Sequence, residues 1–486
     1  MLKNLFSMAQ KPETAIKSFA GAGLFWVFIS VLLGLVSQLQ LFMDLGIPGG
    51  YGFTKPLFHS SLIFGAILGI FQAGAIFIVN RDAGGDAQYS ILAIGGFKLQ
   101  QLGLVIGLAG IALGANNGRE FGEFNFIADN LMLLGLLHVI AMVLINTWNS
   151  ASKINLVYVN ATLGGMFGIY FVGNFGLPFS PLATVPLFTG MQDQYIQEVY
   201  RLGIYCFYIA MPLIALFSTI VPDYLNVPLY SESMARFHIL GSILVLPVAA
   251  AAWLAGTAAP QFLQSIGVFA ALAFYTATFA GAMNICFTVT RTGKTFKLDS
   301  LGEWLKYGAR MIMILALIRG IASFSAVQNL TAYTWFNVRD VSFDAQTYGL
   351  FIMIVALFYV MQITMNHTFG QVSLRLMLIL GGLGLLLALT ANITQGFYQG
   401  ALAARTNAEG QLAITDWNQI LVAGSWYGGE LKEQSQLLTA WMMSLRSVYL
   451  LGHILVVLGL LIPTFSLAWQ MLNRSQGGYQ KPELAQ

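Results

Sequence analysis

The chain has 486 residues, of which 57% are hydrophobic and only 9% are charged, and its formal net charge is +3. Soluble globular chains carry about 25% charged residues, so a chain of this length with so few charges cannot cover a water-facing surface. This composition excludes a soluble enzyme, and the small net charge gives no indication of a nucleic-acid partner.

Twelve apolar stretches are long enough to cross a membrane, because a helix needs about 20 apolar residues to span the hydrocarbon core. Backbone groups in lipid must be hydrogen-bonded within their own segment, so these stretches are predicted to be helices. They lie at about 19–43, 57–80, 91–114, 128–148, 155–175, 199–221, 236–257, 264–290, 305–329, 347–366, 371–397 and 447–473. The sequence therefore predicts an all-α integral membrane protein of about twelve transmembrane helices, with residues 1–486 forming one membrane domain.

Basic residues in the connections predict the orientation of these helices. If the N-terminus is cytoplasmic, the cytoplasmic side carries most of the lysines and arginines, so both chain ends are predicted to be cytoplasmic. The longest connection, about 398–446, then lies on the non-cytoplasmic side. It is polar and contains Trp417, Trp426 and Tyr427, and we expect it to be re-entrant or to pack against a partner.

Five histidines are candidate ligands, because imidazole binds both haem iron and metal ions. They are His59, His138, His238, His367 and His453. No two of them lie three or four residues apart, and the sequence contains no His-x-His and no Cys-x-x-Cys. Any haem or metal would need ligands from different helices, so the residues alone predict no metal site and no catalytic group.

Two arginines, Arg319 and Arg375, lie inside predicted spans. An arginine deep in a membrane is costly and is usually paired or functional. Arg375 lies near the start of its span, so its long side chain can extend to the interface. Arg319, in MILALIRGIASF, leaves two interpretations open: a buried pair, or a side chain that extends to the interface.

Several stretches resemble, in chain order, the catalytic subunit of haem–copper oxidases, in particular the cbb-type cytochrome c oxidases and the related nitric oxide reductases. The stretch KPLFHSSLIFGAILGIFQAGAIFIVNRD at 55–82 is similar to the second helix of that family, in which an early histidine binds the low-spin haem, and His59 falls at that place. Other stretches resemble the loop after the third helix, the sixth helix, the end of the eleventh helix and the last helix. These stretches are 114–137, 190–240, 393–402 and 444–472.

This resemblance covers nearly the whole chain and implies a bundle like that of haem–copper oxidase subunit I. It implies a bacterial inner (cytoplasmic) membrane location and haem b as the candidate cofactor, with His59 as the candidate axial ligand. It also implies a membrane-anchored c-type cytochrome or other respiratory subunits as partners, with lipid around the bundle.

The chain departs from this family at the metal ligands. A Tyr-Gly-His that supplies a copper ligand on the sixth helix reads Tyr-Arg-Leu here, ending at Leu202. The His-His pair of the seventh helix corresponds to VAAAAWLAGTAAP at 248–260, and the His-x-His of the tenth helix to DVSFDAQTYGL at 340–350. A glutamate of the ninth helix corresponds to Ser323 or Ser325. Leucine, alanine and tryptophan cannot ligate copper or haem iron, so a dismantled active site is predicted.

Three functions remain open from the sequence. The leading hypothesis is a non-catalytic membrane subunit of a respiratory electron-transfer complex. The second is an electron-transfer subunit that retains one b-type haem on His59. The third is a proton or solute transporter on the same scaffold, indicated by Arg319 and by the prolines Pro212 and Pro247 inside predicted spans.

Overall fold

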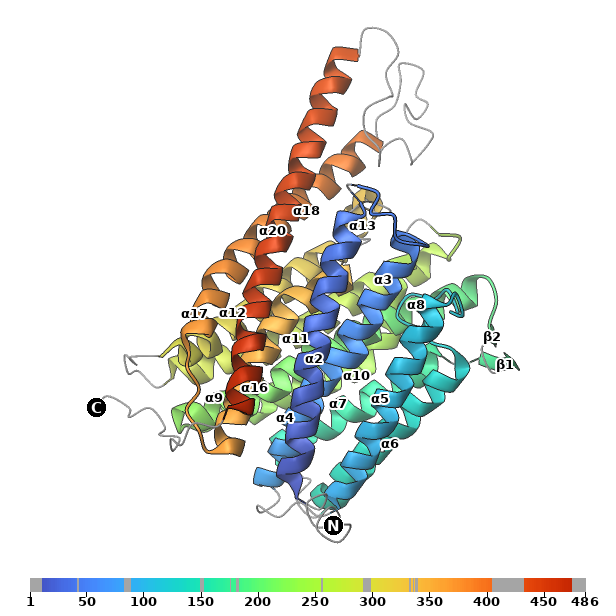
Figure 1. Cartoon of the computed structure of the whole chain (residues 1–486). Coiled ribbons are helices and arrows are strands. Elements are labelled where there is room, and N and C mark those ends of the chain that lie inside the picture. The colour runs from blue at the N-terminus through green and yellow to red at the C-terminus, as the bar shows by residue number, and fades with distance from the viewer. Residues whose placement is uncertain are drawn as a thin grey trace.

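The computed structural model of the chain describes residues 11–41, 43–82, 89–148, 153–174, 176–180, 183–254, 257–291, 299–331, 334, 336, 340–403 and 432–473. Helices make up the bundle (Figure 1). In chain order they are α2 (Pro12–Leu39), α3 (Tyr51–Ser60), η1 (Ser61–Ile67), α4 (Leu68–Asp82), α5 (Ser90–Ala112), α6 (Phe126–Thr147), α7 (Ile154–Gly173), α8 (Met191–Gly203), η3 (Ile204–Ala210), α9 (Met211–Leu225), α10 (Glu232–Ala249), η4 (Ala250–Leu254), α11 (Gln261–Thr290), α12 (Ser300–Ala322), α13 (Ser325–Thr331), α15 (Asp340–Asp344), η5 (Ala345–Gly349), α16 (Leu350–Met365), α17 (Val372–Leu376), η6 (Met377–Gly381), α18 (Gly382–Ala403) and α20 (Lys432–Leu472).

Eleven helical segments in the described part of the chain are long and apolar enough to cross a membrane. A twelfth span arises if α12 and α13, which meet at a bend of 84°, are counted together. The predicted all-α membrane fold of about twelve spans is therefore confirmed. One continuous span was predicted over 305–329, but the helix ends at Ala322, where the hydroxyl of Ser323 donates a hydrogen bond to the Gly320 carbonyl 2.6 Å away.

Three spans form the centre of the bundle. The most apolar windows of Tyr51–Asp82 and Met191–Leu225 are completely buried, and that of Val341–Met365 is 83% buried, whereas the other spans are buried over a third to about half of theirs. A helix that is apolar on all sides is suited to such a central position. Close contact with the outer layer depends on small residues: a Cβ placed on Gly69 of α4 would lie 3.3 Å from the Gly23 Cα of α2.

The last helix is longer than a membrane is thick. At about 1.5 Å per residue, the 41 residues of α20 extend for roughly twice the hydrocarbon thickness of about 30 Å. Its candidate span is Ser444–Leu472, and the first part of the helix projects beyond the bundle (Figure 1). Both ends of the loop predicted over 398–446 are helical, since α18 continues to Ala403 and α20 begins at Lys432. The first residues of α20, KEQSQLLTAWMMSL, are mostly strong helix formers and include no Gly or Pro. Residues 404–431, including Trp417, Trp426 and Tyr427, lie outside the described part.

A short antiparallel hairpin, β1 (Gly176–Ser180) and β2 (Ala183–Pro186), connects α7 to α8 and is absent from the sequence-based prediction. The segment contains three prolines, Pro178, Pro181 and Pro186, which are unsuited to a helix interior. The hairpin lies at the edge of the bundle (Figure 1), away from the central spans.

Candidate functional site

The three segments in which the resemblance places the copper and haem ligands come together around one cavity. Leu202 at the end of α8, Trp253 in η4 and Val341 in α15 all line it. The remaining lining residues are Arg201, Tyr205, Tyr275 and Arg319. The cavity has a volume of about 10 Å³, which is roughly the space for a single water molecule. Side chains therefore fill this part of the bundle almost completely.

Arg319, which lines this cavity, belongs to a buried ion pair. The Arg319 Nε and Nη2 atoms of α12 each lie 2.8 Å from the Asp344 Oδ2 atom of α15. The exposed fractions of the two side chains are only 9% and 3%. A buried charge is tolerated when it is paired and hydrogen-bonded, as both are here. The interpretation of Arg319 as a buried, paired residue is confirmed, and the alternative in which it extends to the interface is wrong.

A second arginine closes the cavity from the side of α8. The guanidinium carbon of Arg201 lies 5.5 Å from the centre of the Trp253 ring, which is a cation–π distance. The Arg201 Nη2 atom also lies 2.8 Å from the Glu198 Oε2 atom one turn earlier. Both arginines of the cavity are thus bound to carboxylates of this chain. Among the described residues, no group of three or more His, Cys, Asp or Glu side chains could hold a metal ion.

Irregular helix geometry marks the same region. Three π-helical segments begin here: η1 two residues after His59, η3 two residues after Leu202, and η5 directly after Asp344. The three segments pack against one another. Such segments are rare and occur often at functional sites. In η5 the backbone of Thr347 leaves the helical region altogether, with φ −87° and ψ −107°. These segments were not predicted from the sequence, because no residue type marks a π-helical turn.

The histidines lie on different elements. They are His59 on α3, His138 on α6, His238 on α10, His367 after α16 and His453 on α20. His59 is 1% exposed, and its ring stacks on Phe121 with the ring centres 4.9 Å apart. The Nε2 atom of Gln346, in η5, lies 3.3 Å from the Nε2 atom of His453.

The 340–350 segment does not supply the axial histidine that the resemblance implies for a low-spin haem b. His59 offers one imidazole, but this segment contains no histidine. Its Asp344 binds Arg319, and its Gln346 amide lies next to the buried imidazole of His453 on α20. Haem iron is held mainly by imidazole, thiolate, thioether or phenolate groups. The side chains of the 340–350 segment therefore do not fit the second axial position of a haem b.

A buried acid lies close to His59. Glu123, in the loop before α6, is 4% exposed, and its Oε2 atom accepts a hydrogen bond from the Ser60 hydroxyl at 3.3 Å. Burial raises the pKa of Glu123 to about 8, and the neighbouring charge of Glu120 contributes to this shift. A carboxyl with such a pKa is mostly protonated at neutral pH.

We expect Glu123→Gln to remove a pH dependence of stability. The pKa of Glu123 in the folded protein, about 8, lies above the ordinary glutamate value of 4.5. The stability that this group contributes is therefore complete below about pH 4.5 and is lost as the pH rises through about 8. The glutamine variant cannot ionise, so it should be more stable than wild type at pH 9 by an amount on the order of a few kcal/mol, with a smaller difference at pH 5.

Thermal unfolding in detergent at pH 5, 7 and 9 measures this difference. Glu232→Gln is the matched control, because the Glu232 side chain is 65% exposed and lies on α10, outside the loop that contains Glu123. Parallel loss of stability in wild type and Glu123→Gln between pH 5 and 9 would contradict the expected titration.

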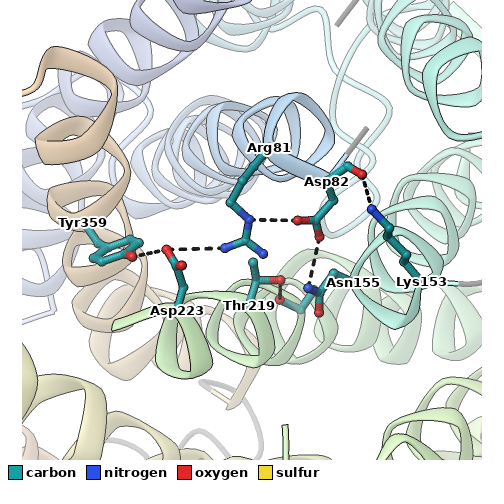
Figure 2. A network of polar contacts seen from close by, with 8 residues as sticks. Arg81, Asp82, Lys153, Asn155, Thr219, Asp223 and Tyr359 are labelled. Carbon is teal, nitrogen blue, oxygen red and sulfur yellow. Dashed lines mark hydrogen bonds and ion pairs between the residues drawn. The ribbon is translucent and has the colours of Figure 1, made fainter. Parts of the chain in front are cut away.

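A polar network ties four helices together at one end of the bundle (Figure 2). The Arg81 Nε atom lies 2.8 Å from the Asp82 Oδ1 atom, and the Arg81 Nη1 atom lies 3.4 Å from the Asp223 Oδ2 atom. Three further side chains donate hydrogen bonds to this network: Tyr359 to the Asp223 carboxylate, Lys153 to the Asp82 carbonyl oxygen at 2.5 Å and Asn155 to the Asp82 Oδ2 atom at 3.1 Å. Its charged side chains are partly exposed, so each ion pair contributes little. The network connects α4, α7, α9 and α16 as a structural clamp.

No family model matches the chain, but several known proteins are similar to it over most of its length. A cytochrome c oxidase subunit 1 homolog of Agrobacterium tumefaciens (strain T37) is 23% identical over 368 residues, which are 71% of this chain and 66% of that relative. The Cbb3-type cytochrome c oxidase subunit CcoN1 of Stutzerimonas stutzeri is 21% identical over 413 residues, covering 82% of this chain and 86% of that relative. Cytochrome c oxidase subunit 1 of Rhodobacter capsulatus is 22% identical, covering 82% of this chain and 78% of that relative.

A solved structure shares the fold. A haem–copper terminal oxidase dimer studied by cryo-electron microscopy matches 96% of this chain and 86% of that chain with a TM-score of 0.67 at 11% identity. The spans and the bacterial oxidase relatives together describe a multi-pass protein of a bacterial inner membrane. The chain is therefore similar over most of its length to subunit 1 of bacterial cytochrome c oxidases, and it has the fold of a haem–copper oxidase chain.

Proposed function

We propose that this chain is a non-catalytic, subunit I-like membrane subunit of a respiratory electron-transfer complex. The observation that carries the proposal is the Arg319–Asp344 ion pair, whose arginine lines the cavity between the segments in which the resemblance places the metal ligands. Dioxygen reduction in haem–copper oxidases needs an open-sided haem iron and a copper ion held by imidazoles. Here Arg319 binds Asp344 and Arg201 lies against Trp253, and the cavity between these segments has space for about one water molecule.

The surface of the chain is then what it contributes to a complex. We expect it to bind respiratory subunits, among them a membrane-anchored c-type cytochrome as the resemblance implies. The projecting part of α20 offers one surface for such a partner outside the membrane (Figure 1). We also propose that both chain ends are cytoplasmic. In support, Gly21 of α2 and Leu472 at the end of α20 line one groove. The start of α2 and the end of α20 therefore lie at the same face of the membrane.

Purification in mild detergent with co-purifying partners tests this function. We expect stoichiometric partner subunits, no oxygen consumption and no nitric oxide reduction by this chain, and no stoichiometric copper in metal analysis. The physical reason is that Leu202, Trp253 and Val341 stand around the cavity and provide no imidazole. One copper ion per chain, lost when a histidine is replaced, would contradict the proposal.

Two further outcomes separate the alternatives. A Soret band that belongs to this chain and disappears in His59→Ala, but persists in the control His138→Ala, would establish the b-haem electron-transfer function instead. A chain that purifies alone, monodisperse and stable, and that mediates solute flux in liposomes would establish the transporter.

A further inference from the structure

An apolar groove runs along the outer surface of the bundle between α2 and α20, which lie side by side (Figure 1). Its volume is about 330 Å³. Its lining residues are Gly21, Leu24, Phe25, Phe28, Thr464, Phe465, Ala468, Met471 and Leu472. The only hydroxyl among them, that of Thr464, donates to the Leu460 carbonyl at 2.7 Å, so the walls present hydrocarbon to any occupant.

The groove is short and apolar along its whole length. From Gly21 to Phe28 it extends for about 10 Å along α2. At one end, the rings of Phe28 and Phe465 meet with their centres 5.2 Å apart. A hydrocarbon chain can lie along these walls.

A positive charge lies on the same face of α2 as the groove. Lys17 precedes Gly21 by four residues, which places it one turn closer to the start of the helix. Its side chain is half-buried and forms no ion pair with any residue in the described ranges. Because α2 begins at Pro12, Lys17 lies near the membrane–water boundary, where lipid headgroups are found.

We propose that this groove binds one acyl chain of an anionic phospholipid, with the lipid phosphate beside Lys17. The hydrocarbon walls accommodate the chain and the lysine favours a negative headgroup over a zwitterionic one. Gly21 deepens the groove, because a Cβ placed there would meet no atom within 4 Å. This site is independent of the proposed function of the chain.

The experiment uses the delipidated full-length protein with its co-purifying partners and adds phosphatidylglycerol or phosphatidylcholine. Native mass spectrometry counts retained lipids, and thermal unfolding reports stabilisation. Wild type should retain about fivefold more phosphatidylglycerol than phosphatidylcholine, the ratio that corresponds to roughly 1 kcal/mol for one lysine near a headgroup. Lys17→Gln should abolish that preference, whereas Gly21→Leu should fold normally and fill the groove, so that both lipids are lost from this site.

Lys306→Gln is the matched control. Lys306 is also a half-buried lysine in the first turns of a helix, α12, and it is not part of the groove. Equal retention of the two lipids by wild type, or undiminished lipid retention in Gly21→Leu, would overturn the proposal. So would a loss of phosphatidylglycerol preference in Lys306→Gln equal to that in Lys17→Gln, or a partner subunit whose release by Gly21→Leu shows that protein occupies the groove.

Discussion

Arg319→Leu is expected to prevent accumulation of the folded protein in the membrane. The substitution leaves the Asp344 carboxylate, 3% exposed, buried without its counter-charge. Removing one partner of a buried ion pair costs about 3–5 kcal/mol, which is a large part of a typical total stability of about 5–15 kcal/mol. The amount of chain recovered as a monodisperse species after detergent extraction measures the effect.

A double variant separates the ion pair from other roles of Arg319. Arg319→Leu combined with Asp344→Leu removes both charges, and apolar replacement of a whole buried pair is often neutral or stabilising. We therefore expect the double variant to recover most of the lost protein. Arg310→Leu is the matched control, since Arg310 is an exposed arginine of the same helix whose guanidinium lies 5.8 Å from the Tyr307 ring centre. Wild-type recovery of the single variant would show that the pair is dispensable, and a double variant as poor as the single one would show that Arg319 acts otherwise.

The spans could be predicted from the sequence because hydrocarbon thickness fixes the length of an apolar helix. The prediction of 264–290, for example, differs from the observed Gln261–Thr290 by only a few residues. The bend after Ala322 could not be predicted, because apolar residues continue on both sides of Ser323. The helical start of α20 was missed for the opposite reason: it is too polar to resemble a span, although its residues favour a helix.

The site could be predicted only in part. The resemblance indicated which segments have lost their ligands, and the position of Arg319 in an apolar stretch indicated a buried charge. The partner of Arg319 was not predicted, because Asp344 lies 25 residues later, beyond any helical spacing. The contact between Arg201 and Trp253 was likewise missed, since it joins α8 to η4 and depends on the packing of the whole bundle.

The second large effect is expected at Gly267, which holds η4 against α11. A Cβ on Gly267 would lie 2.3 Å from the Ala252 backbone nitrogen and 2.6 Å from the Ala251 carbonyl carbon. These are backbone atoms that cannot rotate away, so Gly267→Ala must push η4 and α11 apart. Overpacking of this kind typically costs about 1–3 kcal/mol. We expect a lower thermal unfolding temperature in detergent and, because η4 carries Trp253, altered near-ultraviolet circular dichroism.

A matched substitution shows whether the contact with η4 is the cause. Gly168→Ala in α7 places a Cβ where no atom lies within 4 Å, and alanine favours a helix over glycine by up to about 1 kcal/mol. That control should therefore be neutral or slightly stabilising. If Gly267→Ala is as harmless as Gly168→Ala, η4 can move without cost, and the position of Trp253 over Arg201 is not fixed by its contact with α11. If only Gly267→Ala destabilises, the closed cavity depends on a rigid backbone contact as well as on the Arg319–Asp344 pair.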